Sequence, residues 1–223
     1  MPTSKAARKS ATGNATKDAT KNGTKGPTDG RAAGLVLFPS AGTDASFSAM
    51  VAIEERVSQG ERAIPVRRVD FPYRLAGRRI PDRTPVMVNA VVEATTAMAK
   101  SLKVGTERIL VGGRSMGGRM ASYAVAEGLA VAGLVLVAYP LHPPGHFNEN
   151  RDDHFPSISV PTLFVSGAHD AFASMEELAE SAKKIRGRVS LKFLEGNRRT
   201  GGHALYGQDE QVAALVAAWV RRR

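Results

Sequence analysis

Residues 108–119 read Arg108-Ile-Leu-Val-Gly-Gly-Arg-Ser-Met-Gly-Gly-Arg119, and this stretch decides the fold. An apolar run that ends at Val111 leads through Gly113-Arg-Ser-Met-Gly117 into a segment with helical spacing. This is the pattern G-x-S-x-G in the setting of a strand, a turn and a helix. Glycine is needed two positions to either side of the serine, because a Cβ there would collide with a neighbouring strand or helix. The pattern predicts that Ser115 stands on a sharp, strained turn.

Similar apolar runs recur along the chain, and longer segments with helical spacing separate them. The runs lie at 34–38, 63–69, 132–138, 162–165 and 189–194, and the helical segments at about 45–59, 84–103, 117–128, 174–186 and 207–221. Strands that are apolar throughout are typical of a parallel sheet covered on both faces. We therefore predict a doubly wound α/β domain, with a mainly parallel sheet, helices on both faces and no large cap.

Two helix starts have recognisable capping residues. Thr84 precedes Pro85, which suggests a cap residue followed by proline at the first helical position. Ser174-Met-Glu-Glu177 fits a capping box.

The composition indicates a basic tail followed by one folded domain. Residues 1–30 contain six Lys or Arg, two acids and no aromatic, Leu, Ile or Val residue, so we expect a disordered tail. A transit peptide is the alternative interpretation of this segment. The remaining residues, 31–223, are predicted to form a single domain with a sizeable core.

Charge and cysteine content narrow the function classes. The chain has no cysteine, which excludes disulfides, thiolate metal sites and a thiol nucleophile. The net charge of +10 favours polyanion partners, but the cations are scattered and lack interleaved aromatic residues. We therefore expect no nucleic-acid partner other than one bound through the basic tail. The sequence contains no membrane-length apolar run and no signal-peptide core. We expect a cytoplasmic protein without a membrane association or a cofactor.

A serine nucleophile requires an imidazole base, and the imidazole requires a carboxylate that fixes its tautomer. In this architecture the residues follow successive strands in the order Ser, Asp or Glu, His. Asp170 follows the run at 162–165, and His203 follows the run at 189–194. The sequence therefore predicts Ser115, Asp170 and His203 as catalytic residues. A turn or helix cap before Ser174 is the alternative role for Asp170.

The other histidines compete poorly for the role of base. They are His142, His146, His154 and His169. The first three precede Asp170, which is the wrong order, and the last adjoins it. A metal site built from the first three with Asp152 or Asp153 is an alternative, but prolines at 143 and 144 break the helix that such a pair of ligands requires. We expect no metal.

Two further sets of residues are candidates for substrate contacts. The backbone N–H groups of Met116 and Ala41 are predicted to form an oxyanion hole, with Ser40 or Gly42 as alternatives to Ala41. Arg74, Arg78 and Arg79 follow the second strand and are candidates to hold a substrate carboxylate; pairing with acids such as Asp82, or exposure to solvent, is the alternative. Arg114, inside the turn, is expected to be structural.

From residue 32 onward the chain resembles the dienelactone-hydrolase-like branch of the α/β-hydrolase superfamily. Within that branch it is most similar to the family that groups testis-expressed hydrolase-like proteins with the third subunit of the NSL histone-acetyltransferase complex. The stretches that carry this resemblance are Asp70-Phe-Pro-Tyr73 with Gly77-Arg-Arg79 and Pro81-Asp82, Gly112-Gly-Arg-Ser-Met-Gly-Gly-Arg119, Tyr139-Pro-Leu-His-Pro-Pro-Gly145, and Val160-Pro-Thr-Leu-Phe-Val165 running to Gly167-Ala-His-Asp170. The resemblance implies Ser115, Asp170 and His203 as a triad. Relatives usually have His-Gly where this chain has Pro39-Ser40.

The residues together predict a serine hydrolase that cleaves small esters through an acyl-enzyme. Residues 139–157 are too short for a large helical cap, so we expect a shallow, open pocket. The alternative is a non-catalytic scaffold with a hydrolase fold, whose basic tail binds nucleic acid or an acidic partner.

Overall fold

The computed structural model describes residues 30–143 and 145–223. The predicted tail, residues 1–30, lies outside the described residues except for Gly30. Among the residues described, no helix is long and apolar enough to cross a membrane.

A six-stranded sheet forms the centre of the molecule, with the strand order β2-β1-β3-β4-β5-β6 and every neighbouring pair parallel. The strands are β1 (Gly34–Phe38), β2 (Val66–Arg68), β3 (Ile109–Arg114), β4 (Gly133–Val137), β5 (Thr162–Gly167) and β6 (Val189–Leu194). Because β1 and β3 are neighbours while β2 lies outside β1, the chain reverses its winding direction between β1 and β3. Ligands of open α/β sheets bind beyond the carboxyl ends of the strands at such a point.

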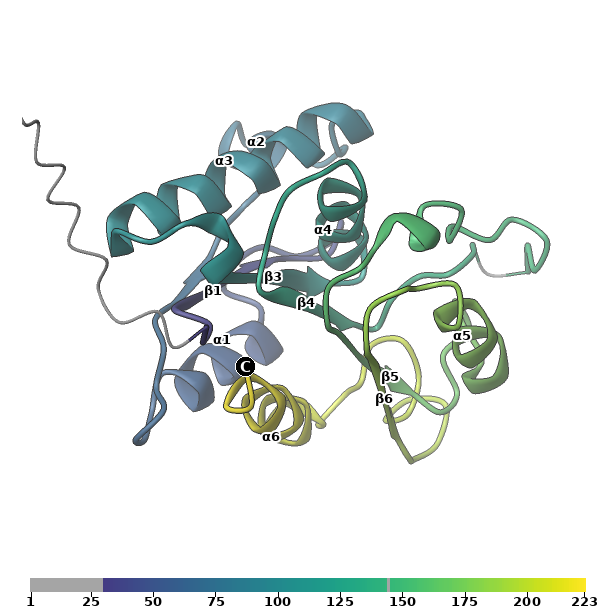
Figure 1. The fold of residues 1–223 in the computed structure, drawn as a ribbon. Coiled ribbons are helices and arrows are strands. Elements are labelled where there is room, and N and C mark those ends of the chain that lie inside the picture. Colours follow the sequence, from purple (N-terminus) through teal and green to yellow (C-terminus); the bar gives the residue numbers. More distant parts are fainter. Residues whose placement is uncertain (1–29, 144) are drawn as a thin grey trace, which may run out of the picture.

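Helices cover both faces of this sheet (Figure 1). The helices α1 (Ser48–Val57) and α6 (Asp209–Val220) pack against each other on one face, and α3 (Thr84–Leu102) and α4 (Met116–Ala126) cover the other. The short α2 (Pro72–Leu75) precedes α3, α5 (Met175–Ala182) lies beside the β6 end of the sheet, and single 3-10 turns occur at Thr106–Arg108 and Phe155–Ser157. The prediction of a doubly wound α/β domain is confirmed.

The strand side chains explain why the apolar runs lack polar alternation. In β1, Val36 and Phe38 pack into the core beneath α3 and α4, whereas Leu35 and Leu37 pack into the core beneath α1 and α6. All four side chains are buried, because successive residues of a strand point to opposite faces and both faces are covered.

One predicted capping residue is wrong and the other is confirmed. Arg83, in an extended conformation, is the N-cap of α3, so Thr84 is the first helical residue and Pro85 the second, and no side chain caps this helix. Proline is tolerated in the first turn because its missing N–H has no partner within the helix there. At α5, Ser174 and Glu177 form the reciprocal hydrogen bonds of a capping box.

Candidate active site

Ser115 occupies the turn between β3 and α4 in a conformation that few residues other than glycine adopt. Its φ is 50° and its ψ is −117°. Backbone hydrogen bonds hold it there: its N–H donates to the Val137 carbonyl at 2.8 Å, and its carbonyl accepts from the Arg119 N–H at 3.1 Å. Such backbone strain costs on the order of 1–3 kcal/mol and clusters at functional sites.

The two glycines that flank Ser115 are required by the approach of strand β1. A Cβ on Gly113 would lie 2.2 Å from the Phe38 carbonyl oxygen, and a Cβ on Gly117 would lie 2.2 Å from the same atom. Both contacts involve backbone and are far shorter than van der Waals contact. The predicted collision with a neighbouring strand is confirmed.

The structure brings Ser115, His203 and Asp170 together, although 88 residues separate the first two. His203 Nε2 lies 2.9 Å from Ser115 Oγ. On the other side of the ring, His203 Nδ1 lies 2.9 Å from Asp170 Oδ2 and 3.0 Å from Oδ1. The carboxylate thus faces the nitrogen opposite the one that contacts the serine, which is the geometry that fixes an imidazole tautomer.

Close backbone contacts place the loop that carries His203. The carbonyl of Gly201 accepts a hydrogen bond from the His169 N–H at 2.8 Å, which joins this loop to the one that carries Asp170. A Cβ on Gly167 would lie 1.9 Å from the Gly201 carbonyl oxygen, and a Cβ on Gly202 would lie 2.2 Å from that of Arg198. Glycine at these positions therefore lets the base and the acid approach each other.

Phe172 also supports the histidine. Its ring centroid lies 4.1 Å from that of His203, with the two planes tilted by 34°. Its N–H donates to Asp170 Oδ1 at 2.8 Å, so the same residue orients the carboxylate. Phe172 was not among the residues predicted from the sequence. Its position two residues after Asp170 is typical of an Asx turn, and this is the signal that could have found it.

Arg114 links the histidine loop to the loop after β1. Its guanidinium donates to the Ser40 hydroxyl at 2.5 Å and to the His203 carbonyl at 2.7 Å, and it lies 4.9 Å from the centre of the Phe47 ring. The side chain is buried. Burial lowers the pKa of Arg114, and the negative charge of Asp170 opposes that shift. The expectation that Arg114 is structural agrees with these contacts, but its partners were not predicted.

The two predicted oxyanion donors lie on the same cavity as Ser115 and His203. Met116 is the first residue of α4, and Ala41 belongs to the loop after β1. The Tyr73 hydroxyl donates to the Ala41 carbonyl at 2.9 Å, which orients the Ala41–Gly42 peptide and with it the N–H of Gly42, the alternative donor. The backbone N–H groups at the start of a helix carry a partial positive charge.

This cavity is open and has a volume of about 640 Å³, within the range of small-molecule sites. Its charged lining comprises Arg83, Arg114, Arg119, Arg151 and Asp82, in addition to His203. Between β4 and β5, the described residues form no helix longer than the 3-10 turn Phe155–Ser157. No helical cap therefore covers the cavity in the described part of the chain.

The three arginines predicted from the sequence to contact substrate lie outside the described lining of this cavity. Arg78 forms two hydrogen bonds with the Asp82 carboxylate, at 2.6 and 3.1 Å, which raise the pKa of Arg78. Arg74 lies 3.4 Å from Asp44, and Arg79 is exposed. None of the three arginines is among the described residues that line the cavity. The alternative interpretation, pairing with acids such as Asp82 or exposure, agrees with this placement.

Three of the remaining histidines have separate partners. His142 Nε2 lies 3.3 Å from Glu177, His146 Nδ1 lies 2.8 Å from Glu149, and His154 Nε2 lies 2.8 Å from the Ser122 hydroxyl. Burial lowers the pKa of His154 to about 4. Within the described residues, no group of three or more His, Asp or Glu side chains is arranged to hold a metal ion.

The comparisons with known proteins agree with this architecture. A family model described as "Alpha/beta hydrolase domain" matches residues 31–212, so the chain belongs to that family. Est1E from Butyrivibrio proteoclasticus with bound ferulic acid is similar in structure, with a TM-score of 0.69 and 14% identity over 87% of this chain and 90% of that one. An α/β serine hydrolase homologue from Coxiella burnetii has a TM-score of 0.67 and 17% identity over 87% and 86%. The esterase domain of a Rhodothermus marinus protein has a TM-score of 0.63 and 16% identity over 88% and 90%. At such identities these likenesses show the fold.

Proposed function

We propose that this protein is a serine hydrolase that cleaves esters of small acids through an acyl-enzyme intermediate. The observation that carries the proposal is the hydrogen-bonded series from Ser115 Oγ to His203 Nε2, and from His203 Nδ1 to the Asp170 carboxylate, at 2.9 Å for each link. It opens onto a cavity of about 640 Å³ in a protein of the alpha/beta hydrolase domain family.

In the first half of the reaction, Ser115 Oγ attacks the ester carbonyl carbon while His203 Nε2 accepts the hydroxyl proton. Asp170 stabilises the imidazolium that forms. The carbonyl oxygen, now negatively charged, lies against the N–H groups of Met116 and Ala41. His203 then protonates the leaving alcohol, and the acyl group stays on Ser115.

In the second half, a water molecule takes the place of the alcohol. His203 accepts a proton from this water, whose oxygen attacks the acyl carbon. The tetrahedral intermediate collapses, the bond to Ser115 Oγ breaks, and His203 returns the proton to the serine. The products are the free acid and the original enzyme.

The substrate class is proposed from the shape of the site. Within the described residues no helical cap covers the cavity, which favours short or surface-presented acyl groups over long lipid chains. The resemblance to dienelactone-hydrolase-like proteins, noted from the sequence, supports the same size class.

Labelling with a fluorophosphonate, followed by peptide mass mapping, tests the proposal. A fluorophosphonate reacts with a serine that an adjacent base activates, so we expect one adduct, on Ser115. On a panel of short-chain 4-nitrophenyl esters, Ser115→Ala is expected to lower kcat by on the order of 10³- to 10⁶-fold. A folded protein that takes up no label at Ser115 would contradict the proposal and favour the scaffold alternative.

A further inference from the structure

Positive charge dominates the lining of the cavity at Ser115. Among the described residues, four arginines and one carboxylate line it, apart from the histidine. The carboxylate, Asp82, accepts both hydrogen bonds from Arg78, which lies outside the lining. Arg114 is engaged with Ser40 and the His203 carbonyl. The charge of the lining is therefore neutralised only in part by the protein.

Of the four described arginines that line the cavity, Arg83 is exposed and Arg114 is engaged as above, so Arg119 and Arg151 are the two half-buried ones that remain for a ligand. Within the part of the chain that the structure describes, neither guanidinium lies within ion-pair distance of an acid. Glu149, two residues before Arg151, pairs with His146. The Nε atom of Arg119 is buried and has no hydrogen-bond partner among residues 30–143 and 145–223. A buried N–H group without a partner is costly, so such a site favours an incoming acceptor.

The charge of Arg119 acts on Arg151. Burial lowers the pKa of Arg151, and the positive charge of Arg119 lowers it further. Two like charges held close together in a partly buried site repel each other, and an oxyanion between them would convert this repulsion into attraction. Arginine is suited to this because its planar guanidinium presents paired donors to a carboxylate or a phosphate.

Both arginines are held at fixed positions relative to Ser115. Arg119 is four residues after Ser115 on α4, one turn away, and its N–H donates to the Ser115 carbonyl at 3.1 Å. The backbone of Arg151 is held at both ends: its N–H donates to the Leu141 carbonyl at 2.7 Å, and its carbonyl accepts from the Tyr139 hydroxyl at 2.9 Å. The fold therefore sets the backbone positions from which the two side chains extend to the cavity.

We infer that Arg119 and Arg151 form an anion subsite of the cavity and that the protein acts on esters that carry an acidic group, a carboxylate or a phosphate, close to the scissile bond. This inference rests on the proposed function for the reaction, but the binding of an anion does not. The acidic group lies between the two guanidiniums while the ester carbonyl reaches Ser115 Oγ. This pair replaces Arg74, Arg78 and Arg79 as the substrate-contacting arginines.

A pair of esters tests the inference by turnover. Mono-(4-nitrophenyl) adipate and 4-nitrophenyl heptanoate have acyl chains of similar length, and only the first ends in a carboxylate. We expect the wild-type protein to have the higher kcat/KM for the adipate. Arg119→Gln and Arg151→Gln are each expected to lower the ratio of the two kcat/KM values by about 10- to 100-fold, as for loss of a charged hydrogen bond.

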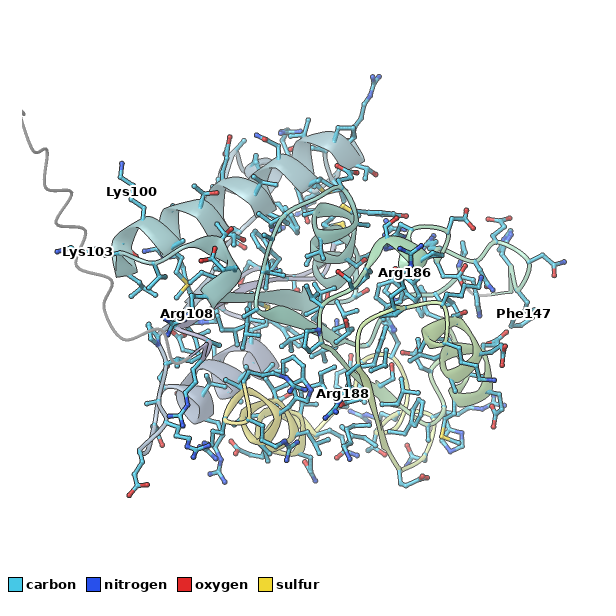
Figure 2. All side chains as sticks on the ribbon, viewed as in Figure 1. Lys100, Lys103, Arg108, Phe147, Arg186 and Arg188 are labelled. Atoms are coloured by element: carbon cyan, nitrogen blue, oxygen red, sulfur yellow. The ribbon has the colours of Figure 1, made fainter. Side chains whose placement is uncertain are left out.

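Lys100→Gln is the matched control, because it also removes one positive charge. Lys100 is exposed near the end of α3 opposite to the cavity residues Arg83, Thr84 and Met87 (Figure 2). The ratio is expected to stay unchanged in this variant. A ratio that is unchanged in both arginine variants, or that falls equally in the lysine variant, would overturn the inference.

Binding to the Ser115→Ala protein separates this inference from the proposed function. Calorimetric titration with monomethyl adipate is expected to give binding that Arg151→Gln weakens by at least about 10-fold, whereas neutral dimethyl adipate binds more weakly and responds little. Binding of the monoanion without turnover by the wild-type protein would refute the proposed function and leave the anion subsite standing. Turnover of both esters without preference for the charged one, or no binding of the monoanion, would refute the subsite alone.

Discussion

Replacement of Arg114 by methionine should separate the positioning of His203 from the stability of the fold. Methionine keeps the apolar stem but removes both hydrogen bonds, to Ser40 Oγ and to the His203 carbonyl. A hydrogen bond to a charged group contributes about 1.5–3 kcal/mol to stability. The desolvation of a buried guanidinium offsets much of this, so we expect the free energy of unfolding to fall by only about 1–3 kcal/mol.

Replacing Arg114 should affect the rate of ester hydrolysis more than it affects the stability of the fold. Without Arg114, the backbone at His203 loses its link to the loop after β1, and the 2.9 Å contact between the imidazole and Ser115 Oγ is no longer enforced from that side. A misplacement of about 1 Å at a reacting group costs roughly 100-fold in rate, so we expect kcat to fall by about 10- to 100-fold. KM should change little, because the lost contacts are to the protein itself.

The assay combines ester hydrolysis, the rate of fluorophosphonate labelling at Ser115 and urea-induced unfolding. Ser40→Ala is the matched control: it removes one partner of Arg114 and leaves the bond to His203, so its loss of kcat should be smaller. A folded Arg114→Met protein that hydrolyses esters and reacts with the label at wild-type rates would refute the reasoning. A rise in KM with an unchanged kcat would refute it as well.

Two further predictions concern stability. Gly117→Ala places a Cβ 2.2 Å from the Phe38 carbonyl oxygen, so it should lower the free energy of unfolding by about 1–3 kcal/mol or more. Gly42→Ala is the control: its Cβ meets no described atom within 4 Å and should change this free energy by less than about 0.5 kcal/mol. Urea denaturation measures both. Equal effects of the two substitutions would contradict the steric argument. Burial lowers the pKa of His154 to about 4, so the free energy of unfolding should depend on pH. Above pH ~6.5 the imidazole is neutral in both the folded and the unfolded state. As the pH falls toward 4, the unfolded chain binds a proton at His154 that the folded protein does not bind, which destabilises the fold. We expect the free energy of unfolding to fall by about 1–2 kcal/mol between pH ~6.5 and 4, a value already reduced for the partial exposure of His154. The plot of this free energy against pH should be flatter for His154→Asn, and parallel plots for the two proteins would contradict the prediction.

Local patterns in the sequence determined the architecture and the order of the site residues. The apolar runs predicted buried parallel strands, because a strand covered on both faces needs no polar alternation, as the side chains of β1 show. The glycines around Ser115 predicted the turn, because the collision that they avoid depends on backbone geometry within a few residues. Chain order and strand ends were then enough to select Asp170 and His203 from the acids and histidines. In the structure, His203 lies within hydrogen-bond distance of both Asp170 and Ser115.

Only the tertiary structure decided which long side chains meet. Arg78 follows the second strand, near the predicted site by topology, but it pairs with Asp82. Arg119 and Arg151 line the cavity from different parts of the chain, and neither has an acid within ion-pair distance among the described residues. The N-cap of α3 lies one residue earlier than predicted, at Arg83, which is extended, while Thr84 before Pro85 is already helical. A flexible charged side chain can reach partners far away in the chain, and its contacts depend on which groups the fold brings within reach. Sequence spacing specifies backbone geometry over short distances, and it does not specify these long-range pairings.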